Sequence, residues 1–234
     1  MNSNFNHIIK IGDEMCTRSA VALELLIEVI MKPSFLVILK IIIMKPMNHL
    51  SFLIMFGMIV VGYRKGKLKK DKKNWPEWIR QHIWSHIGVA YPDEYGLHIK
   101  ESVIQGFRRR KFDDHYSWDH NAVKFMRFNT PLTDSQIYTL VKVSDRLIKE
   151  NKGYQFLSIV NWAIIVVRLL LEMKKEINNK PSKFDLFFDS EKWTICYESA
   201  HRQFKAILPA EFEGDSERVS LYDIYRPDIM HVIF

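Results

Sequence analysis

The stretch SHIGVAYPDEYGLHIKESVIQG, residues 85–106, decides how this chain folds. It contains two short, mostly apolar runs, residues 85–92 and 96–106, on either side of a turn that ends in glycine. Two such runs joined by a tight turn predict a pair of strands that form an antiparallel hairpin. Residues 122–129 (AVKFMRFN) then alternate apolar and polar side chains, which predicts a third, half-buried strand.

The long helices are expected after these strands. Thr133 and Gln136 have the spacing of a capping box, which predicts a helix that ends near Gly153. Another helix is predicted to start at Cys196 and to end near Leu208, just before a proline. Strands followed by long helices, with a few strands returning later, are typical of an α+β domain. We also predict a short helix at 74–83, an almost wholly apolar helix at 154–177, a strand-like segment at 57–63 and a closing strand at 231–234.

The first 46 residues differ in character from the rest of the chain. Their apolar runs are separated by the repeated tripeptide MKP, and each is shorter than the roughly 18–20 continuous apolar residues that span a bilayer. Pro33 and Pro46 interrupt any long helix, and the order of features expected of a signal peptide is missing. We therefore expect a helical or membrane-associated N-terminal extension over residues 1–46 and a folded domain over 47–234. The location that this predicts is cytoplasmic or membrane-associated.

Composition and charge limit the classes of function. With 234 residues, 47% hydrophobic and 26% charged, the chain fits a globular protein. Its net charge of +7 suits an anionic partner, and the positive residues gather at 63–73 and 106–111, where they are either solvated surface or a contact site. No specific nucleic-acid signature accompanies them. The two cysteines, Cys16 and Cys196, cannot build a disulfide framework, and the scattered histidines predict neither a metal centre nor a cofactor.

Cys196 lies in the stretch KWTICYESAHRQF (192–204) and is either a buried apolar filler or a nucleophile. A nucleophilic cysteine needs a lowered thiol pKa, a base within reach and donors for the developing oxyanion. The start of a helix favours both a thiolate and an oxyanion. His86, on an apolar strand, is a candidate base or a buried structural histidine. Glu101, on the next strand, is a candidate to orient that base or a surface acid. The residues alone leave these alternatives open.

Five segments of the chain carry a more specific signal through their order. They are WSHIGVA (84–90), IKESVIQGF (99–107), FMRFNTPLTDSQ (125–136), KGYQF (152–156) and KFDLFFDSEKWTICYESAHRQF (183–204). This order resembles the permuted papain-like amidases of the YiiX/YaeF type, within the NlpC/P60 superfamily of cysteine peptidases. That family has a Ser-His-x-Gly strand, a following strand with glutamate, and a Cys-Ser-Glu-Leu helix start, so its histidine precedes its cysteine. The resemblance covers about residues 55–234.

The resemblance implies a circularly permuted papain-like fold over residues 47–234, with an antiparallel sheet packed against helices. It implies Cys196 as the nucleophile, His86 as the general base and acid, and Glu101 as the group that orients the histidine. The implied activity is hydrolysis of an amide bond, such as a cell-wall-type peptide bond, through a thioester and without a cofactor. The implied partner is a peptide or another amide substrate.

Further residues are implied by the same resemblance. Glu198 matches a glutamate that follows the family's cysteine, and we expect it to support the site. Tyr154 matches a tyrosine before the central helix. The chain departs from the pattern at Tyr197, where the family has serine, at Gln155, where the family has an acidic residue, and at Gly57, which is followed by methionine instead of aspartate. We expect Tyr197 and Tyr154 to influence substrate binding.

Two other functions remain open at this stage. One keeps the same site but directs it to lipid, as an acyltransferase or thioesterase at a membrane surface, because residues 1–46 are so apolar. The other is a catalytically inactive basic module that binds phosphates through Arg108, Arg109, Arg110 and Lys111.

Overall fold

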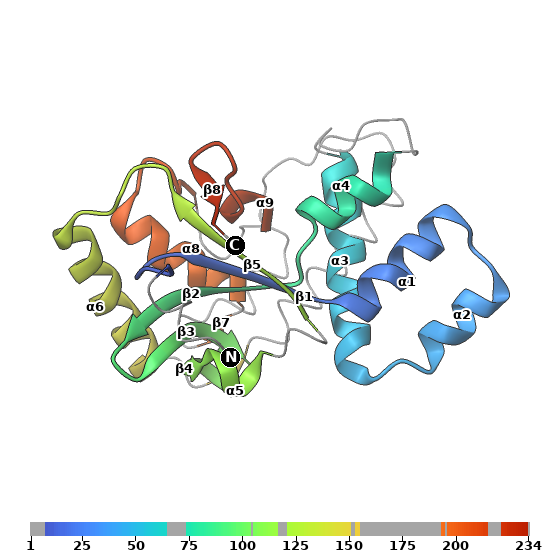
Figure 1. The fold of residues 1–234 in the computed structure, drawn as a ribbon, viewed down its shortest axis with the longest axis horizontal. Coiled ribbons are helices and arrows are strands. Elements are labelled where there is room, and N and C mark those ends of the chain that lie inside the picture. The colour runs from blue at the N-terminus through green and yellow to red at the C-terminus, as the bar shows by residue number, and fades with distance from the viewer. Residues whose placement is uncertain are drawn as a thin grey trace, which may run out of the picture.

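The protein has an α+β fold built on a six-stranded antiparallel sheet (Figure 1). The computed structural model describes residues 8–64, 74–103, 105–116, 121–150, 153–154, 193–194, 196–214 and 221–233. The strand order in the sheet is β4-β3-β2-β1-β5-β8, and a two-residue parallel pair, β6 and β7, lies apart from it. The strands are β1 Glu14–Ser19, β2 His86–Asp93, β3 Gly96–Val103, β4 Gly106–Lys111, β5 Asn121–Phe128, β6 Gly153–Tyr154, β7 Trp193–Thr194 and β8 Met230–Val232.

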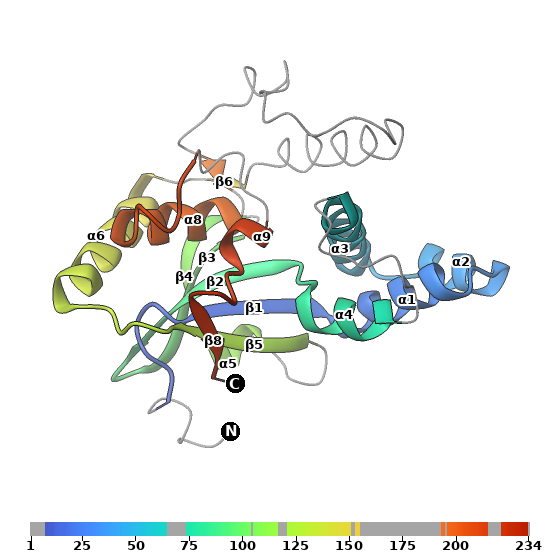
Figure 2. The same cartoon turned by 90° about the horizontal axis from the view of Figure 1, so that it is seen from above.

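The helices form two groups (Figure 1). Helices α6 and α8 pack on each other, and α8 also packs on β2 and β3. Helices α1 to α4 gather at the other end of the sheet, as the view from above also shows (Figure 2). The helices are α1 Ala20–Met31, α2 Phe35–Ile42, α3 Pro46–Arg64, α4 Trp75–His82, α5 Phe112–His115, α6 Asp134–Glu150, α8 Cys196–Ile207 and α9 Leu221–Ile224.

Several elements agree with the sequence. The hairpin is confirmed as β2 and β3, which pair antiparallel from Val89 opposite Lys100 onward. The capping box of α6 is confirmed, because the Thr133 N–H donates to Gln136 Oε1 at 2.9 Å and the Gln136 N–H donates to Thr133 Oγ1 at 3.3 Å. Helix α8, strand β5, helix α4 and the closing strand β8 are also found where they were expected. The predicted helix at 154–177 falls outside the described residues except for its first residue.

The strand-like reading of residues 57–63 is wrong, because these residues continue helix α3. Met55, Met58 and Ile59 follow helical spacing and are all buried against the main hydrophobic core. Burial of this helical stripe outweighs the β-propensity of the valines and isoleucine in the segment.

Strand β1 was not predicted, and it occupies the centre of the sheet between β2 and β5. The first 46 residues are therefore not all an extension, since one of their segments builds the sheet itself. The side chain of Arg18, at the end of β1, donates to the backbone carbonyls of Ile79 at 3.2 Å and of Ile83 at 2.6 Å. These carbonyls lie at the end of α4, so a buried guanidinium caps that helix and joins it to the sheet. Within the described residues, no helix is both long and apolar enough to cross a bilayer.

Strand β1 also places an acid in the core. The side chains of Glu14 and Cys16 have no solvent exposure, and the Cys16 thiol donates to Glu14 Oε1 at 3.0 Å. Burial raises the pKa of the Glu14 carboxyl to about 8, although the hydrogen bond from Cys16 and the charge of Lys124 act in the opposite direction. Glu14 is therefore protonated in the folded protein at neutral pH.

This buried acid makes stability depend on pH. Between the ordinary carboxyl pKa of 4.5 and about 8, the folded state holds a proton that the unfolded state releases. The free energy of unfolding should then fall as pH rises through this window, by about 5 kcal/mol. Glu14→Gln should remove that fall, because glutamine is neutral at every pH and has nearly the same shape. Urea unfolding at several pH values measures the free energy of unfolding of the wild type and of Glu14→Gln. If the difference between these two free energies stays constant with pH, Glu14 does not have a raised pKa.

Candidate functional site

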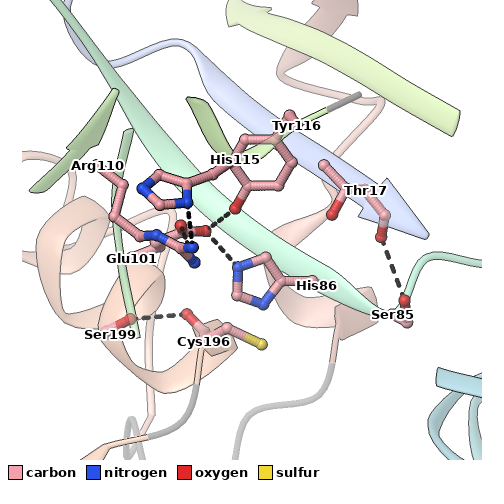
Figure 3. Close-up of polar contacts among 9 residues, drawn as sticks. All are labelled: Thr17, Ser85, His86, Glu101, Arg110, His115, Tyr116, Cys196 and Ser199. Atoms are coloured by element: carbon pink, nitrogen blue, oxygen red, sulfur yellow. Dashed lines mark hydrogen bonds and ion pairs between the residues drawn. The ribbon is translucent and has the colours of Figure 1, made fainter. Parts of the chain in front are cut away.

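Three side chains that are far apart in the sequence meet at one end of the sheet (Figure 3). His86 is the first residue of β2, Glu101 lies on the neighbouring strand β3, and Cys196 is the first residue of α8. They meet because β2 and β3 pair antiparallel while α8 packs against both strands. We call these three residues the His–Glu–Cys cluster.

The imidazole of His86 lies between the other two members of the cluster. Its Nε2 is 2.5 Å from Glu101 Oε2, and its other ring nitrogen, Nδ1, points towards the sulfur of Cys196 (Figure 3). The His86 ring is close enough to the Cys196 sulfur to lower the pKa of the thiol. The Glu101 side chain has no exposure, whereas 22% of the His86 side chain remains exposed. The histidine is thus held in one orientation by a buried carboxylate, which fixes the tautomer.

Gly88 allows the two strands to carry these side chains so close together. A Cβ atom at this position would lie 2.4 Å from Ile99 Cγ2 and 3.3 Å from the Cβ of Glu101. Any larger residue would therefore push β3 away from β2 just where Glu101 reaches His86. This explains the glycine two residues after the histidine in physical terms.

Two residues that the sequence did not indicate for this role also hold Glu101. Tyr116 Oη donates to Glu101 Oε2, and Arg110 Nη1 donates to Glu101 Oε1 at 3.5 Å (Figure 3). Arg110 reaches the carboxylate diagonally across the β3–β4 pair, and it also donates to His115 Nδ1 at 2.6 Å. The carboxylate therefore receives hydrogen bonds from three side chains, which is enough to keep a buried acid ionised.

The electrostatics of the cluster favour an ion pair. Burial alone would lower the pKa of His86, but Cys196 and Glu101 raise it to about 10. Burial alone would raise the pKa of the Cys196 thiol, but the charge and hydrogen bond of His86 bring it below its ordinary value. Burial likewise opposes ionisation of Glu101, whose pKa is nevertheless lowered by His86, Tyr116 and Arg110. The arrangement stabilises a thiolate beside an imidazolium, with a carboxylate behind it.

Backbone donors add to this effect at the cysteine. The backbone N–H groups of Ile87 and Tyr197 also act on the Cys196 sulfur and lower the pKa of the thiol. The sulfur also lies at the first turn of α8, where the helix dipole favours negative charge. The other cysteine is the opposite case, because burial and the nearby Glu14 raise the pKa of Cys16 well above its ordinary value. Of the two thiols, only that of Cys196 has a lowered pKa, which favours the reactive thiolate.

A short chain of polar contacts ties the helical end of the molecule to the strand that carries His86. The Ser51 hydroxyl on α3 donates to Ser85 Oγ at 2.9 Å, and the Ser85 N–H donates to the Thr17 carbonyl at 3.1 Å. Ser85 immediately precedes His86, and Figure 3 shows it beside Thr17 at the edge of the site. Strand β1 and helix α3 thus help to fix where β2 begins.

The remaining candidate residues have different surroundings. Glu198 is buried and pairs with Arg202 one turn along α8 at 2.8 Å, which suits a supporting role in the helix. The Tyr197 side chain packs at the edge of the main core, and burial raises the pKa of its hydroxyl. The backbone of Tyr154 pairs with Thr194, two residues before Cys196, so this segment lies beside the entry to α8. A role of Tyr154 and Tyr197 in substrate binding stays a prediction.

The basic run at 106–111 forms the edge strand β4. Alternation along a strand sends Arg108 and Arg110 to one face and Arg109 and Lys111 to the other. Arg110 takes part in the site, and Arg109 forms an ion pair with Asp93. The four cations therefore do not make a single phosphate-binding face. In the parts of the chain that the structure describes, no three His, Cys, Asp or Glu side chains are grouped to hold a metal ion.

Comparisons with known proteins add no identification. No protein-family model matches the chain, and no curated protein matches it. Function is therefore argued from the geometry of the His–Glu–Cys cluster.

Proposed function

We propose that this protein is a cysteine hydrolase that cleaves an amide bond, such as a peptide bond, through a thioester intermediate. The observation that carries the proposal is the position of His86, whose two ring nitrogens face Glu101 on one side and Cys196 on the other. A nucleophile, a base and a group that orients the base are the parts that acyl transfer requires.

A circularly permuted papain-like fold is part of the same proposal. Its support is the order of the elements: the strand with the histidine comes first, the strand with the glutamate follows, and the helix that begins at the cysteine comes last. The antiparallel sheet packed against α8 is consistent with that fold.

In the first half of the proposed reaction, the Cys196 thiolate attacks the carbonyl carbon of the amide. Negative charge moves to the carbonyl oxygen, and backbone N–H groups at the start of α8, including that of Cys196, are the donors available to it. The His86 imidazolium then gives its Nδ1 proton to the leaving nitrogen, and the C–N bond breaks. The products are a thioester on Cys196 and a free amine.

In the second half, neutral His86 takes a proton from water, and the resulting hydroxide attacks the thioester carbonyl. The C–S bond breaks, the acid leaves, and the thiolate–imidazolium pair is restored. Glu101 accepts the His86 Nε2–H throughout, which keeps Nδ1 facing the sulfur. The Glu101 carboxylate also stabilises the positive charge of the His86 ring.

Trapping of the intermediate tests the proposal. The reagent is an activated ester or anilide that acylates Cys196 faster than water removes the acyl group. Mass spectrometry should then find the mass of the acyl group added to the peptide that contains Cys196. Hydroxylamine should remove the added mass, because it cleaves thioesters. Cys16 provides an internal control, since its protonated, fully buried thiol should stay unmodified. Acylation of Cys16 with none at Cys196 would contradict the proposed nucleophile.

A second candidate function uses the same site on a lipid, as a transferase or thioesterase for acyl chains. The observation that favours it is the group of exposed apolar side chains on α2, which suits a protein that works at a membrane. The two functions differ in the product: an amidase releases amine from soluble amides, whereas a lipid enzyme needs vesicles or micelles before product appears.

A further inference from the structure

Helix α2 exposes apolar side chains to an unusual degree. Six large apolar residues over positions 35–43 are exposed, with Phe35 at 80%, Ile43 at 74% and Ile42 at 67%. Scattered exposed apolar residues are normal on a protein surface, but a contiguous group of this kind marks an interaction site. We call this group the α2 patch, and its members are Phe35, Leu36, Ile38, Leu39, Ile42 and Ile43.

The patch covers one side of the helix and leaves the other for packing. At about 100° per residue, its six members fall within an arc of roughly 160°. Val37 points to the opposite side and is buried, and α2 packs against α1. The two figures of the whole chain show α2 at the far end of the molecule, away from the sheet (Figures 1 and 2). The apolar arc therefore faces outward at a protruding corner.

The charged residues that flank the patch along the chain are lysines. Residues 29–64 contain no aspartate or glutamate, and Lys32 and Lys45 flank α2 as exposed residues. A third lysine, Lys40, lies within the helix and pairs with Glu28 of α1 at 3.1 Å. An apolar arc flanked by lysines matches a surface whose interior is apolar and whose boundary is negatively charged.

The dimensions of the patch favour a lipid surface over a protein. A stable protein interface uses about 20–30 residues on each side, and the patch is confined to six side chains on one short helix. The eight residues of α2 extend only about 12 Å, which is much less than the roughly 30 Å of a bilayer interior. The helix can therefore lie in the interface but cannot cross it.

We propose that α2 inserts its apolar patch into the surface of a bilayer that contains anionic lipids, with Lys32 and Lys45 at the level of the phosphates. The helix lies parallel to the membrane, and the sheet with the His–Glu–Cys cluster stays in water beside it. This attachment does not depend on the chemistry of Cys196, so it stands or falls separately from the proposed hydrolase activity.

Co-sedimentation of the full chain with vesicles tests the proposal. Wild-type protein should bind vesicles of phosphatidylcholine mixed with phosphatidylglycerol more tightly than vesicles of phosphatidylcholine alone. Phe35→Ser combined with Ile42→Ser and Ile43→Ser should weaken binding to the mixed vesicles by roughly 100-fold, because three apolar side chains no longer enter the acyl region. Tyr138→Ser is the matched control: Tyr138 is 69% exposed on α6, and its loss should leave binding unchanged.

A second variant tests the charges and does not touch the apolar side chains. Lys32→Gln with Lys45→Gln should weaken binding to the mixed vesicles by on the order of tenfold and leave binding to neutral vesicles unchanged. Circular dichroism checks that each variant is folded. Failure of the folded wild type to bind either vesicle, or equal binding by the triple variant, would overturn the proposal. Analytical ultracentrifugation gives one more outcome that would overturn it: the wild type is a dimer, the triple variant is a monomer, and lipid has no effect on either. A second copy of the chain would then cover the patch.

Discussion

Replacement of Cys196 by alanine should abolish hydrolysis of any amide that the wild-type protein cleaves, with a loss of at least roughly 10³-fold in kcat/KM. The reason is that alanine has no atom that can attack the carbonyl, while His86 and Glu101 remain in place. The loss should appear in kcat and not in KM, because the sulfur forms its bond only as the reaction proceeds. Measurement of released amine under steady-state conditions gives both constants.

Cys16→Ser is the matched control for this variant. Serine keeps a donor for Glu14 Oε1, and Cys16 lies in the core of the sheet, apart from the His–Glu–Cys cluster. Its activity should equal that of the wild type. A Cys196→Ala protein that hydrolyses the amide as fast as the wild type would contradict the proposed nucleophile.

Glu101→Gln should lower kcat by roughly 10²–10⁴-fold while leaving the fold intact. Glutamine has nearly the shape of glutamate but no negative charge, so it no longer stabilises the imidazolium. Its amide N–H group also donates to Nε2, which leaves the proton on Nδ1 of a neutral ring. The pKa of His86 should then fall from about 10 towards its ordinary value of 6.5, and the thiolate should form at higher pH than in the wild type.

The pH profile separates this effect from simple damage to the structure. In the wild type the thiolate–imidazolium pair exists between the lowered pKa of Cys196 and the raised pKa of His86, so activity should form a plateau between them. Glu101→Gln should narrow that plateau, whereas Tyr116→Phe keeps the carboxylate, loses one hydrogen bond and should change kcat by only about tenfold. An unchanged profile in folded Glu101→Gln protein would exclude Glu101 as the residue that orients the base.

Local patterns in the sequence were sufficient for much of the fold. The hairpin of β2 and β3, the capped start of α6 and the start of α8 at Cys196 all depend on neighbouring residues, so each could be predicted. Strand β1 could not be predicted, because Glu14 and Arg18 are ionisable side chains that are buried, in a short segment whose sequence is polar. Their burial depends on distant partners, such as the carbonyls at the end of α4.

The site residues also divide into those that the sequence could predict and those that it could not. His86, Glu101 and Cys196 could be named as candidates from the sequence, and the structure brings their side chains together. Tyr116 and Arg110 could not be found in this way. Arg110 was one of several arginines in a basic run, and only the alternation along β4 turns it towards Glu101. Tyr116 follows a four-residue helix and has no sequence pattern that marks it.

The central claim is that Cys196 is a thiolate because His86 stands beside it as an imidazolium. Ultraviolet absorbance of the thiolate as a function of pH measures this most directly, in a Cys16→Ser background where Cys196 is the remaining cysteine. We predict that Cys196 ionises below the ordinary thiol pKa of 9.0, and that His86→Ala raises this pKa, because burial is then opposed only by the backbone donors and the start of α8. A thiol that ionises at 9.0 or higher in the presence of His86, with no change in the His86→Ala protein, would contradict the account.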